Sequence, residues 1–246
     1  MSGAAEAWLG TSGYVYRHWR KGVFYPPGLP AREELAYFAS RFRTVELNNP
    51  FYRLPTPEMF QRWRQVTPSG FRFAVKASRY ITHIKRLHQV QDELALFLKR
   101  ADQLGPKLGP VLFQLPPTFQ CDILRLAGFL ALLSRDRQWV LEFRHPSWHT
   151  SEVYQLLTDH SVALCIPVGG GLHPDRVTTA QLTYFRMHRG QEPGGGFTEA
   201  ELTAWAAQIR GLRAEGKEVY VYFNNDWEGY AIRDAIRLRE LLGLPR

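Results

Sequence analysis

The chain is poor in cysteine and has no long apolar run, and these absences exclude several classes of protein. It contains two cysteines in 246 residues, Cys121 and Cys165, so we expect reduced thiols rather than a disulfide-stapled secreted domain. No run of 18 apolar residues occurs, and we therefore predict no membrane span and no membrane partner. The first residues, MSGAAEAWLG, lack the basic start and apolar core of a secretory signal, which predicts a cytoplasmic protein.

Acidic residues are the minority among the charged ones. There are 31 Lys and Arg against 23 Asp and Glu, which gives a net charge of +8 and a pI of about 9.7. A basic surface favours anionic partners, such as a phosphorylated small molecule or a nucleic acid. Genomic bias or thermal adaptation also produces basic proteins, so the charge alone selects no function. The sequence does not fix the oligomeric state.

Short apolar segments alternate with amphipathic ones along the whole chain, which predicts strands followed by helices. We expect strands over residues 7–13, 44–49, 71–78, 110–115, 138–144, 162–168, 182–188 and 218–224. We expect helices over residues 30–42, from 56 onward, and over 90–103, 122–134, 151–159, 198–214 and 228–242. The segment 169–181 begins with three glycines, so the sixth helix should be short or missing. A length of 246 residues suits a single (β/α)8 TIM-type barrel domain over residues 1–246, since such barrels have about 250 residues.

Several of these strands end in polar side chains spaced two residues apart. The pairs are Glu46 and Asn48, Glu142 and Arg144, Arg186 and His188, and Tyr222 and Asn224. Because a strand alternates its faces, each pair shares one face while the apolar residue between them takes the other. An open parallel sheet is usually apolar on both faces, so the polar face favours a closed barrel over a doubly wound sheet. The expected inward side chains are Glu46, Asn48, Lys76, Gln114, Glu142, Arg144, Arg186, His188 and Asn224.

These inward residues lie near the carboxyl ends of their strands, where barrel enzymes keep their active sites. We interpret them as the site of a hydrolytic enzyme that acts on a phosphate-bearing or otherwise anionic substrate. Glu46 or Glu142 would be the base and His188 the acid. Cations would bind the anion and amides would orient neutral polar atoms; the cations are Lys76, Arg144 and Arg186, and the amides Asn48, Gln114 and Asn224.

Two other interpretations of the same residues stay open. The charges could form a purely internal network, with pairs such as Glu46–Lys76 and Glu142–Arg144, because buried charges must be compensated. A divalent metal is the other alternative, with ligands from Glu46, Glu142, His145 and His188. We do not favour a metal, since no His-x-His spacing is present and three nearby cations would repel it. The cofactor is therefore left unknown.

Three loops that follow predicted strands combine aromatic and basic residues. They span residues 13–28, 49–55 and 78–89, and we expect Tyr14, Trp19, Phe51 and Tyr52 to contact the substrate. Interleaved aromatic and basic side chains also suit nucleic-acid binding or a nuclease-like repair function. Two glutamates with many aromatics suggest a carbohydrate-active barrel as a further alternative. Aromatic packing that seals the loops onto the barrel is the simpler explanation.

The motifs VELNNPFYRLP, FAVKAS, LFQLPPTF, LEFRHPSW and VYFNND occur in this order and resemble the YecE-like family, also called domain of unknown function 72. The resemblance runs from Gly10 to about Leu242. It implies a TIM-type barrel and names no activity. The family's recurring polar positions coincide largely with the inward residues above and add Phe51, Tyr52, His145, Trp148 and Asn225. The chain departs from the family after Arg186, where it reads Met187-His188-Arg189-Gly190, and at Cys165-Ile166-Pro167, where an acid is common.

Overall fold

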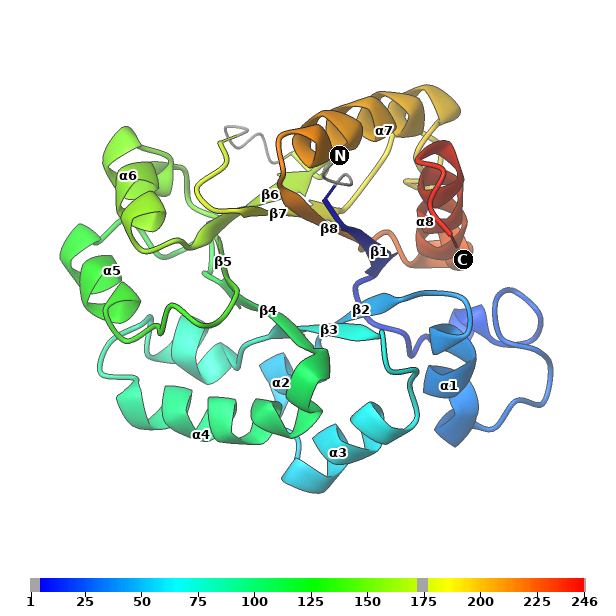
Figure 1. Ribbon diagram of the computed structural model, residues 1–246, viewed down its shortest axis with the longest axis horizontal. Coiled ribbons are helices and arrows are strands. Elements are labelled where there is room, and N and C mark those ends of the chain that lie inside the picture. The colour runs from blue at the N-terminus through cyan, green and yellow to red at the C-terminus, as the bar shows by residue number, and fades with distance from the viewer. Residues whose placement is uncertain (1–4, 172–176, 246) are drawn as a thin grey trace.

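The computed structural model describes residues 5–171 and 177–245 and forms a nearly closed barrel of parallel strands (Figure 1). The sheet in this part of the chain has eight strands in the order β1-β8-β7-β6-β5-β4-β3-β2. They are β1 (Ala7–Thr11), β2 (Thr44–Leu47), β3 (Arg72–Lys76), β4 (Leu108–Gln114), β5 (Trp139–Glu142), β6 (Ala163–Val168), β7 (Leu182–Met187) and β8 (Glu218–Phe223). The predicted barrel of alternating strands and helices is confirmed.

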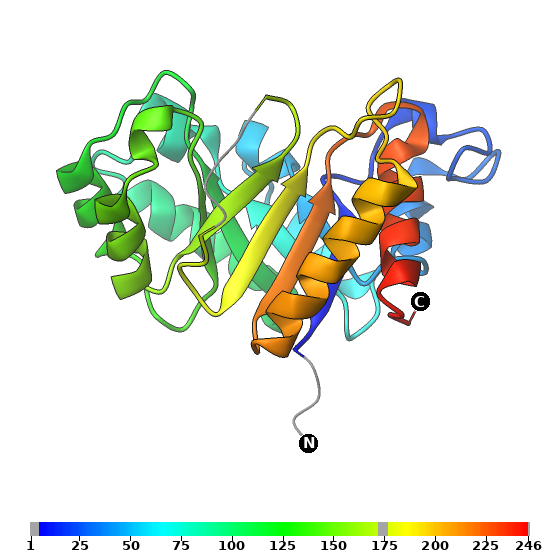
Figure 2. The ribbon, with the colours of Figure 1, turned by 90° about the horizontal axis from the view of Figure 1, so that it is seen from above.

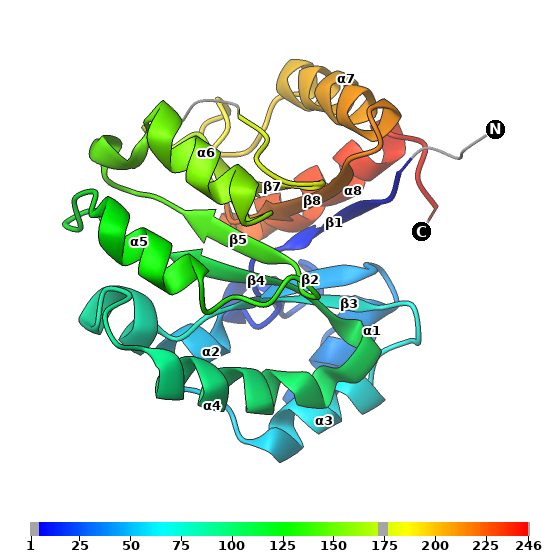
Figure 3. The same cartoon turned by 60° about the vertical axis from the view of Figure 1, so that its left-hand side comes forward.

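Helices surround the strands and cover their outer face (Figures 1 and 3). They are α1 (Glu34–Ala39), α2 (Asn49–Tyr52), α3 (Pro57–Gln65), α4 (Gln91–Ala101), α5 (Ile123–Leu130), α6 (Ser151–Asp159), α7 (Glu199–Ala214) and α8 (Tyr230–Leu241). Thr198 and Glu201 form a capping box at the start of α7, which lies along the outside of β8 (Figure 2). Within the described ranges, no helix combines the length and the apolar content that crossing a bilayer requires.

The connection between β6 and β7 contains no helix in its described residues, 169–171 and 177–181. The remaining part of the expected gap, residues 172–176, lies outside the described residues. The expectation of a weak or missing sixth helix therefore agrees with every described residue of this connection.

The barrel closes between β1 and β2 through a close approach of two backbones. Gly13 N donates to Glu46 O at 2.8 Å, and Ser12 and Glu46 form a parallel bridge. A Cβ atom at Gly10 would lie 2.2 Å from Thr44 O, so a residue with a side chain could not occupy this position without moving one strand. Glycine at position 10 therefore permits the two end strands to meet.

Apolar side chains form two layers, one on each face of the sheet. The outer layer packs the strands on the helices and includes Leu47, Phe143, Met187 and Phe223, the residues that the alternation assigned to that face. The inner layer fills the lower barrel and consists of Trp8, Ala74, Leu112, Val140, Ala163, Cys165, Leu182, Tyr184, Tyr220 and Tyr222. These stacked side chains close the barrel from below, so the polar groups above them lie in a chamber with one open end.

Some predicted boundaries were wrong at the carboxyl ends of the strands. The first strand ends at Thr11 rather than residue 13, and the loop expected at 49–55 contains the short helix α2. The strands β2, β5, β7 and β8 each end before the second residue of the polar pair. Asn48, Arg144, His188 and Asn224 thus lie at the start of the following loops, yet they still line the cavity at the barrel mouth. The chain turns there because each loop must leave the barrel toward its helix.

Candidate functional site

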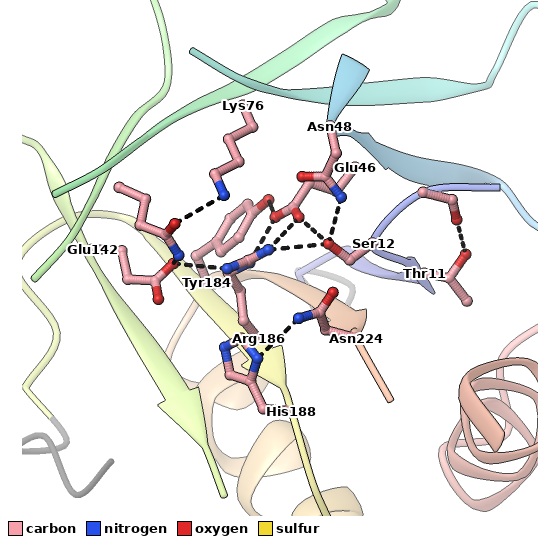
Figure 4. Close-up of polar contacts among 12 residues, drawn as sticks. Thr11, Ser12, Glu46, Asn48, Lys76, Glu142, Tyr184, Arg186, His188 and Asn224 are labelled. Carbon is pink, nitrogen blue, oxygen red and sulfur yellow. Dashed lines mark hydrogen bonds and ion pairs between the residues drawn. The ribbon is translucent and has the colours of Figure 1, made fainter. Parts of the chain in front are cut away.

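The centre of the barrel mouth is the guanidinium of Arg186 on β7, which lies between two glutamates from distant strands (Figure 4). Its Nε and Nη2 donate to Glu46 on β2 at 3.1 and 2.9 Å, and its Nη1 donates to Glu142 on β5 at 3.0 Å. All three side chains are almost completely buried. Alternation placed each of them inward, but only the closed barrel brings β2, β5 and β7 together around one cation.

Glu46 is saturated with hydrogen bonds. Besides the two bonds from Arg186, Oε2 accepts from the Tyr184 hydroxyl at 2.7 Å, and Oε1 accepts from the Ser12 hydroxyl. Ser12 Oγ also accepts from Arg186 Nη2 at 3.1 Å and from Asn48 Nδ2 at 3.0 Å. Sequence reasoning missed Ser12 and Tyr184. Tyr184 lies two residues before Arg186, so the same period-two rule assigns it to the inner face.

Glu142 is held in a similar way by groups from three strands. Its Oε2 accepts from Gln114 Nε2 on β4 at 3.0 Å as well as from Arg186. An ion pair with Arg144 engages its other oxygen. The predicted Glu142–Arg144 pair is therefore present, whereas Glu46 pairs with Arg186 and not with Lys76. The internal network expected as an alternative exists in this modified form.

The two glutamates are poorly suited to act as general bases. Burial alone would raise their pKa values, but the charge of Arg186 together with the hydrogen bonds from Arg186, Ser12 and Tyr184 lowers the pKa of Glu46. For Glu142, burial is opposed by the positive charges around it, chiefly Arg186 and Arg144, which lower the pKa to about 2. A base works best when its pKa lies near the working pH. In this arrangement the two carboxylates hold Arg186 and neutralise its charge instead of standing free to accept a proton.

His188 links the network to the last strand (Figure 4). Its Nε2 lies 3.2 Å from Arg144 Nη2, and its Nδ1 lies 2.9 Å from the Asn224 amide. Arginine can only donate, so Nε2 must accept and the proton must be on Nδ1. The structure places Asn224 Nδ2 against Nδ1, so this tautomer requires the Asn224 amide to turn over and present its oxygen to Nδ1.

Burial, Arg186 and Arg144 lower the pKa of His188 to about 4. The imidazole is consequently neutral near pH 7 and carries no proton on Nε2. An imidazole without a proton on Nε2 is not placed to act through that nitrogen as the acid, the role expected from the sequence. A neutral imidazole whose Nε2 accepts a hydrogen bond is instead suited to accept a proton.

Lys76 ends β3 and reaches the same chamber from the opposite side (Figure 4). Its Nζ donates to Gln114 Oε1 at 2.8 Å and lies 3.9 Å from the centre of the Phe51 ring. Burial and the charge of Arg186 lower its pKa to about 8. Lys76 therefore carries a proton that it can release near neutral pH, unlike an ordinary lysine with a pKa of about 10.4.

A cavity of about 1280 Å³ opens above this network at the carboxyl ends of the strands. Its described lining contains five cationic side chains and no carboxylate, because Glu46 and Glu142 lie beneath it. The cations are Arg53, Lys76, Arg100, Arg144 and Arg186, the amides Asn48, Asn49, Gln114 and Asn224, and the rings Tyr14, Tyr16, Tyr52, Trp63 and His188. The chamber thus attracts anions and offers aromatic surface beside them.

Besides Glu46 and Glu142, four predicted site residues do not line the cavity. Trp19 is fully buried and donates to Asp226 O at 2.8 Å, so it packs the first loop and cannot contact a ligand. Asn225 donates to Gly195 O and to Asp234 Oδ2, and thereby holds the loop before α7. His145 Nδ1 accepts from Ser147 N, and Phe51 lies beneath Lys76. Local packing against neighbouring loops, which the sequence does not display, sets these orientations.

The possible metal ligands do not converge on a common point. Glu142 and His188 each contact Arg144, Glu46 is bound to Arg186, and His145 is engaged with Ser147. Across residues 5–171 and 177–245, no three side chains of His, Cys, Asp or Glu are arranged to hold a metal ion. The charged groups are thus positioned to contact one another and an anion.

Fold and site together define a TIM-type α/β barrel with a cation-lined chamber at its mouth. The model of the family described as "Protein of unknown function DUF72" matches residues 8–246, so the chain belongs to this family. The resemblance to the YecE-like family is thereby confirmed.

Relatives and solved structures agree with this assignment. The chain is 29% identical over 254 residues to the UPF0759 protein YunF of Bacillus subtilis, covering 89% of this chain and 90% of YunF. It is 36% identical over 122 residues to the UPF0759 protein YecE of Escherichia coli K12, covering 49% and 44% of the two chains. A DUF72 family protein of Thermotoga maritima superposes with a TM-score of 0.83 at 29% identity, covering 97% of this chain and 99% of that one.

Proposed function

We propose that the protein is an enzyme that acts on a phosphate-bearing or otherwise anionic small molecule bound in the mouth cavity. The observation that supports this proposal is the lining itself, with five cations and no carboxylate among its described residues. Glu46 and Glu142 together balance the charges of Arg186 and Arg144, so Lys76, Arg53 and Arg100 supply the net attraction. Arg144 offers the planar donor set that suits a phosphate or carboxylate.

The groups placed to move protons are His188 and Lys76. His188 is neutral near pH 7 and can accept a proton, while Lys76, with a pKa of about 8, can release one. Hydrolysis with a glutamate base, as expected from the sequence, loses support because both carboxylates are bound to Arg186. The arrangement favours reactions that an imidazole and an amine promote.

Binding of matched phosphorylated and dephosphorylated compounds tests the proposal. We would measure affinity by calorimetry for sugar phosphates and nucleoside monophosphates beside the same molecules without phosphate. Phosphate-bearing members should bind at least about tenfold more tightly, since a charge-assisted hydrogen bond contributes roughly 1.5–3 kcal/mol. Arg144→Gln should remove most of this preference, whereas the exposed Arg237→Gln should not. Equal affinity for both sets in the unmodified protein would refute the proposal.

Nucleic-acid binding is the second candidate, and exposed aromatics around the mouth favour it. Tyr52, Tyr80 and Trp227 follow β2, β3 and β8 and are 72%, 48% and 61% exposed. Rings on the face toward which the strands point can stack on bases, each worth about 1–3 kcal/mol. Fluorescence anisotropy with labelled single-stranded and duplex oligonucleotides should then show a steep loss of affinity with salt. Tyr52→Ala and Trp227→Ala should weaken binding, and salt-independent binding would rule out this function.

A carbohydrate-active site is not favoured by the geometry. Retaining glycosidases place the scissile bond between two carboxylates. Here Arg186 lies between Glu46 and Glu142 and binds both. No substrate bond can enter that space while the arginine remains there.

A further inference from the structure

Two lysines of this chain, Lys76 and Lys107, are buried, and they differ in the number of hydrogen-bond acceptors around the ammonium group. Lys107 Nζ donates to Arg64 O, Thr67 O and Thr67 Oγ1 at 2.5, 2.5 and 3.0 Å. These three acceptors use all the donors of an ammonium group, so Lys107 has a structural role. Lys76 has a single hydrogen-bond acceptor, Gln114 Oε1, among the described residues.

Lys76 is also open toward the cavity although little of it is exposed. Its side chain is 8% exposed, it lines the cavity, and within the described ranges it forms no ion pair with a carboxylate. Gln114 fixes the position of Nζ from one side and the Phe51 ring supports it from another. Because Lys76 lines the cavity, a ligand bound there lies beside this side chain.

This environment supports both protonation states of the amine. Burial and Arg186 favour the neutral form and lower the pKa to about 8, while the Phe51 ring stabilises the ammonium. At pH 7.5, a lysine with a pKa of 8 is neutral in roughly one molecule in four, against roughly one in a thousand at a pKa of 10.4. A neutral amine fixed beside a cation-lined cavity is a nucleophile.

We propose that Lys76 condenses with the aldehyde or ketone group of an anionic substrate to form an imine. This inference rests on the proposed function, because the cations of the cavity must hold the anionic end of the same molecule. The Nζ lone pair forms the bond to the carbonyl carbon as the carbonyl π pair moves to oxygen; oxygen takes up one proton and nitrogen loses one, which gives a neutral carbinolamine. The carbinolamine oxygen then takes up a second proton, the carbon–oxygen bond breaks as water leaves, and nitrogen loses its second proton as the C=N bond forms. No oxidant or reductant takes part.

Pyridoxal 5′-phosphate is a suitable probe, because it carries an aldehyde and a phosphate on one aromatic ring. The protein would be incubated with the probe, reduced with borohydride, digested and examined by mass spectrometry. The chain has six lysines, Lys21, Lys76, Lys85, Lys99, Lys107 and Lys217. We expect Lys76 to be labelled at least about tenfold faster than the exposed lysines, a smaller factor than the roughly two-hundredfold difference in neutral amine. Inorganic phosphate should slow this labelling.

Matched variants separate imine formation from anion binding. Lys76→Arg keeps the charge but cannot form an imine and should abolish the fast labelling, while the exposed Lys99→Arg should leave it unchanged. Circular dichroism would show that Lys76→Arg is folded. Comparable labelling of all exposed lysines, with Lys76 no faster, would overturn the inference.

The aldehyde-free analogue 4-deoxypyridoxine 5′-phosphate distinguishes failure of the inference from failure of the proposed function. In one outcome, the analogue binds in a way that depends on its phosphate and on Arg144 while the aldehyde forms no adduct. That result would refute imine formation and support the proposed function. Absence of both binding and adduct would count against both. Phosphate-dependent binding together with a Lys76 adduct would support both.

Discussion

The Arg186 guanidinium holds the Glu46 carboxylate at both oxygens, with Nε 3.1 Å from Oε2 and Nη2 2.9 Å from Oε1. Its third nitrogen, Nη1, lies 3.0 Å from Glu142 Oε2. One cation on β7 therefore neutralises carboxylates from β2 and β5 across the interior of the barrel. This relationship fixes the floor of the cavity and determines which groups remain available for chemistry.

Replacing Arg186 should destabilise the fold strongly. Arg186→Met leaves two buried carboxylates without their shared cation, and breaking a buried pair typically costs about 3–5 kcal/mol. Urea unfolding should show a lower midpoint with an unchanged slope. Arg237→Met is a matched control, because Arg237 pairs with Glu199 and Glu240 on the exposed surface and should shift the midpoint little. Equal shifts in both variants would show that the buried network does not stabilise the fold.

Stability should fall in acid because Glu142 has a lowered pKa in the folded protein. Its folded value of about 2 lies below the ordinary 4.5, so the unfolded state takes up a proton first as the pH falls. The contribution of Glu142 is complete above about pH 4.5 and is lost as the pH approaches 2. Glu142→Gln should make the unfolding free energy less dependent on pH in this window. A pH dependence identical to that of the unmodified protein would contradict the assignment.

His188 should titrate far below an ordinary histidine. Burial, Arg186 and Arg144 lower its pKa to about 4 from 6.5, and an NMR titration of the ring protons should show this, with the signal assigned by its loss in His188→Asn. Because protonation is disfavoured in the folded state, His188 contributes stability above pH 6.5 that is lost as the pH falls toward 4. Arg144→Gln should raise this pKa. A value near 6.5 would mean that His188 is solvated and outside the network.

Alanine substitutions at two glycines should have opposite effects. In Gly10→Ala the new Cβ would lie 2.2 Å from Thr44 O, so the contact between β1 and β2 must widen, at a cost of about 1–3 kcal/mol as for an overpacked core. Gly211 lies in α7 with open space around its Cβ direction, and Gly211→Ala should stabilise the protein by about 0.5–1 kcal/mol. Thermal or urea unfolding measures both. Tolerance of Gly10→Ala would show that the barrel closes without this approach.

The strand pattern predicted which side chains face inward, and the reason is local. Successive side chains on a strand point to opposite faces, so Arg186 and Tyr184 had to share a face once β7 was recognised. The same rule could not show which inward side chains contact one another, because an alternation of two residues along a strand does not tell which strands face each other across the barrel. The sequence suggested that Glu46 pairs with Lys76, whose strand β3 lies next to β2. In the structure, Arg186 on β7 binds Glu46 from the other side of the barrel.

The chemical roles of the site residues also depended on the tertiary structure, because they are set by neighbours that are distant in the sequence. A glutamate or histidine in a sequence carries no indication of its pKa, which burial and neighbouring charges set. The closed barrel places Arg186 between Glu46 and Glu142 and thereby removes both from base chemistry. It also removes Trp19 and Asn225 from the cavity by packing them against neighbouring loops.

The sequence by itself determined the barrel, the family and the set of inward polar residues, because periodicity and local motifs encode them. Only the tertiary structure decided that Arg186 is neutralised, that His188 is neutral and that Lys76 remains available in a cavity whose described lining residues include no carboxylate. Those properties arise from distances between residues far apart in the chain, and electrostatic interactions depend on distance and burial rather than on order along the sequence.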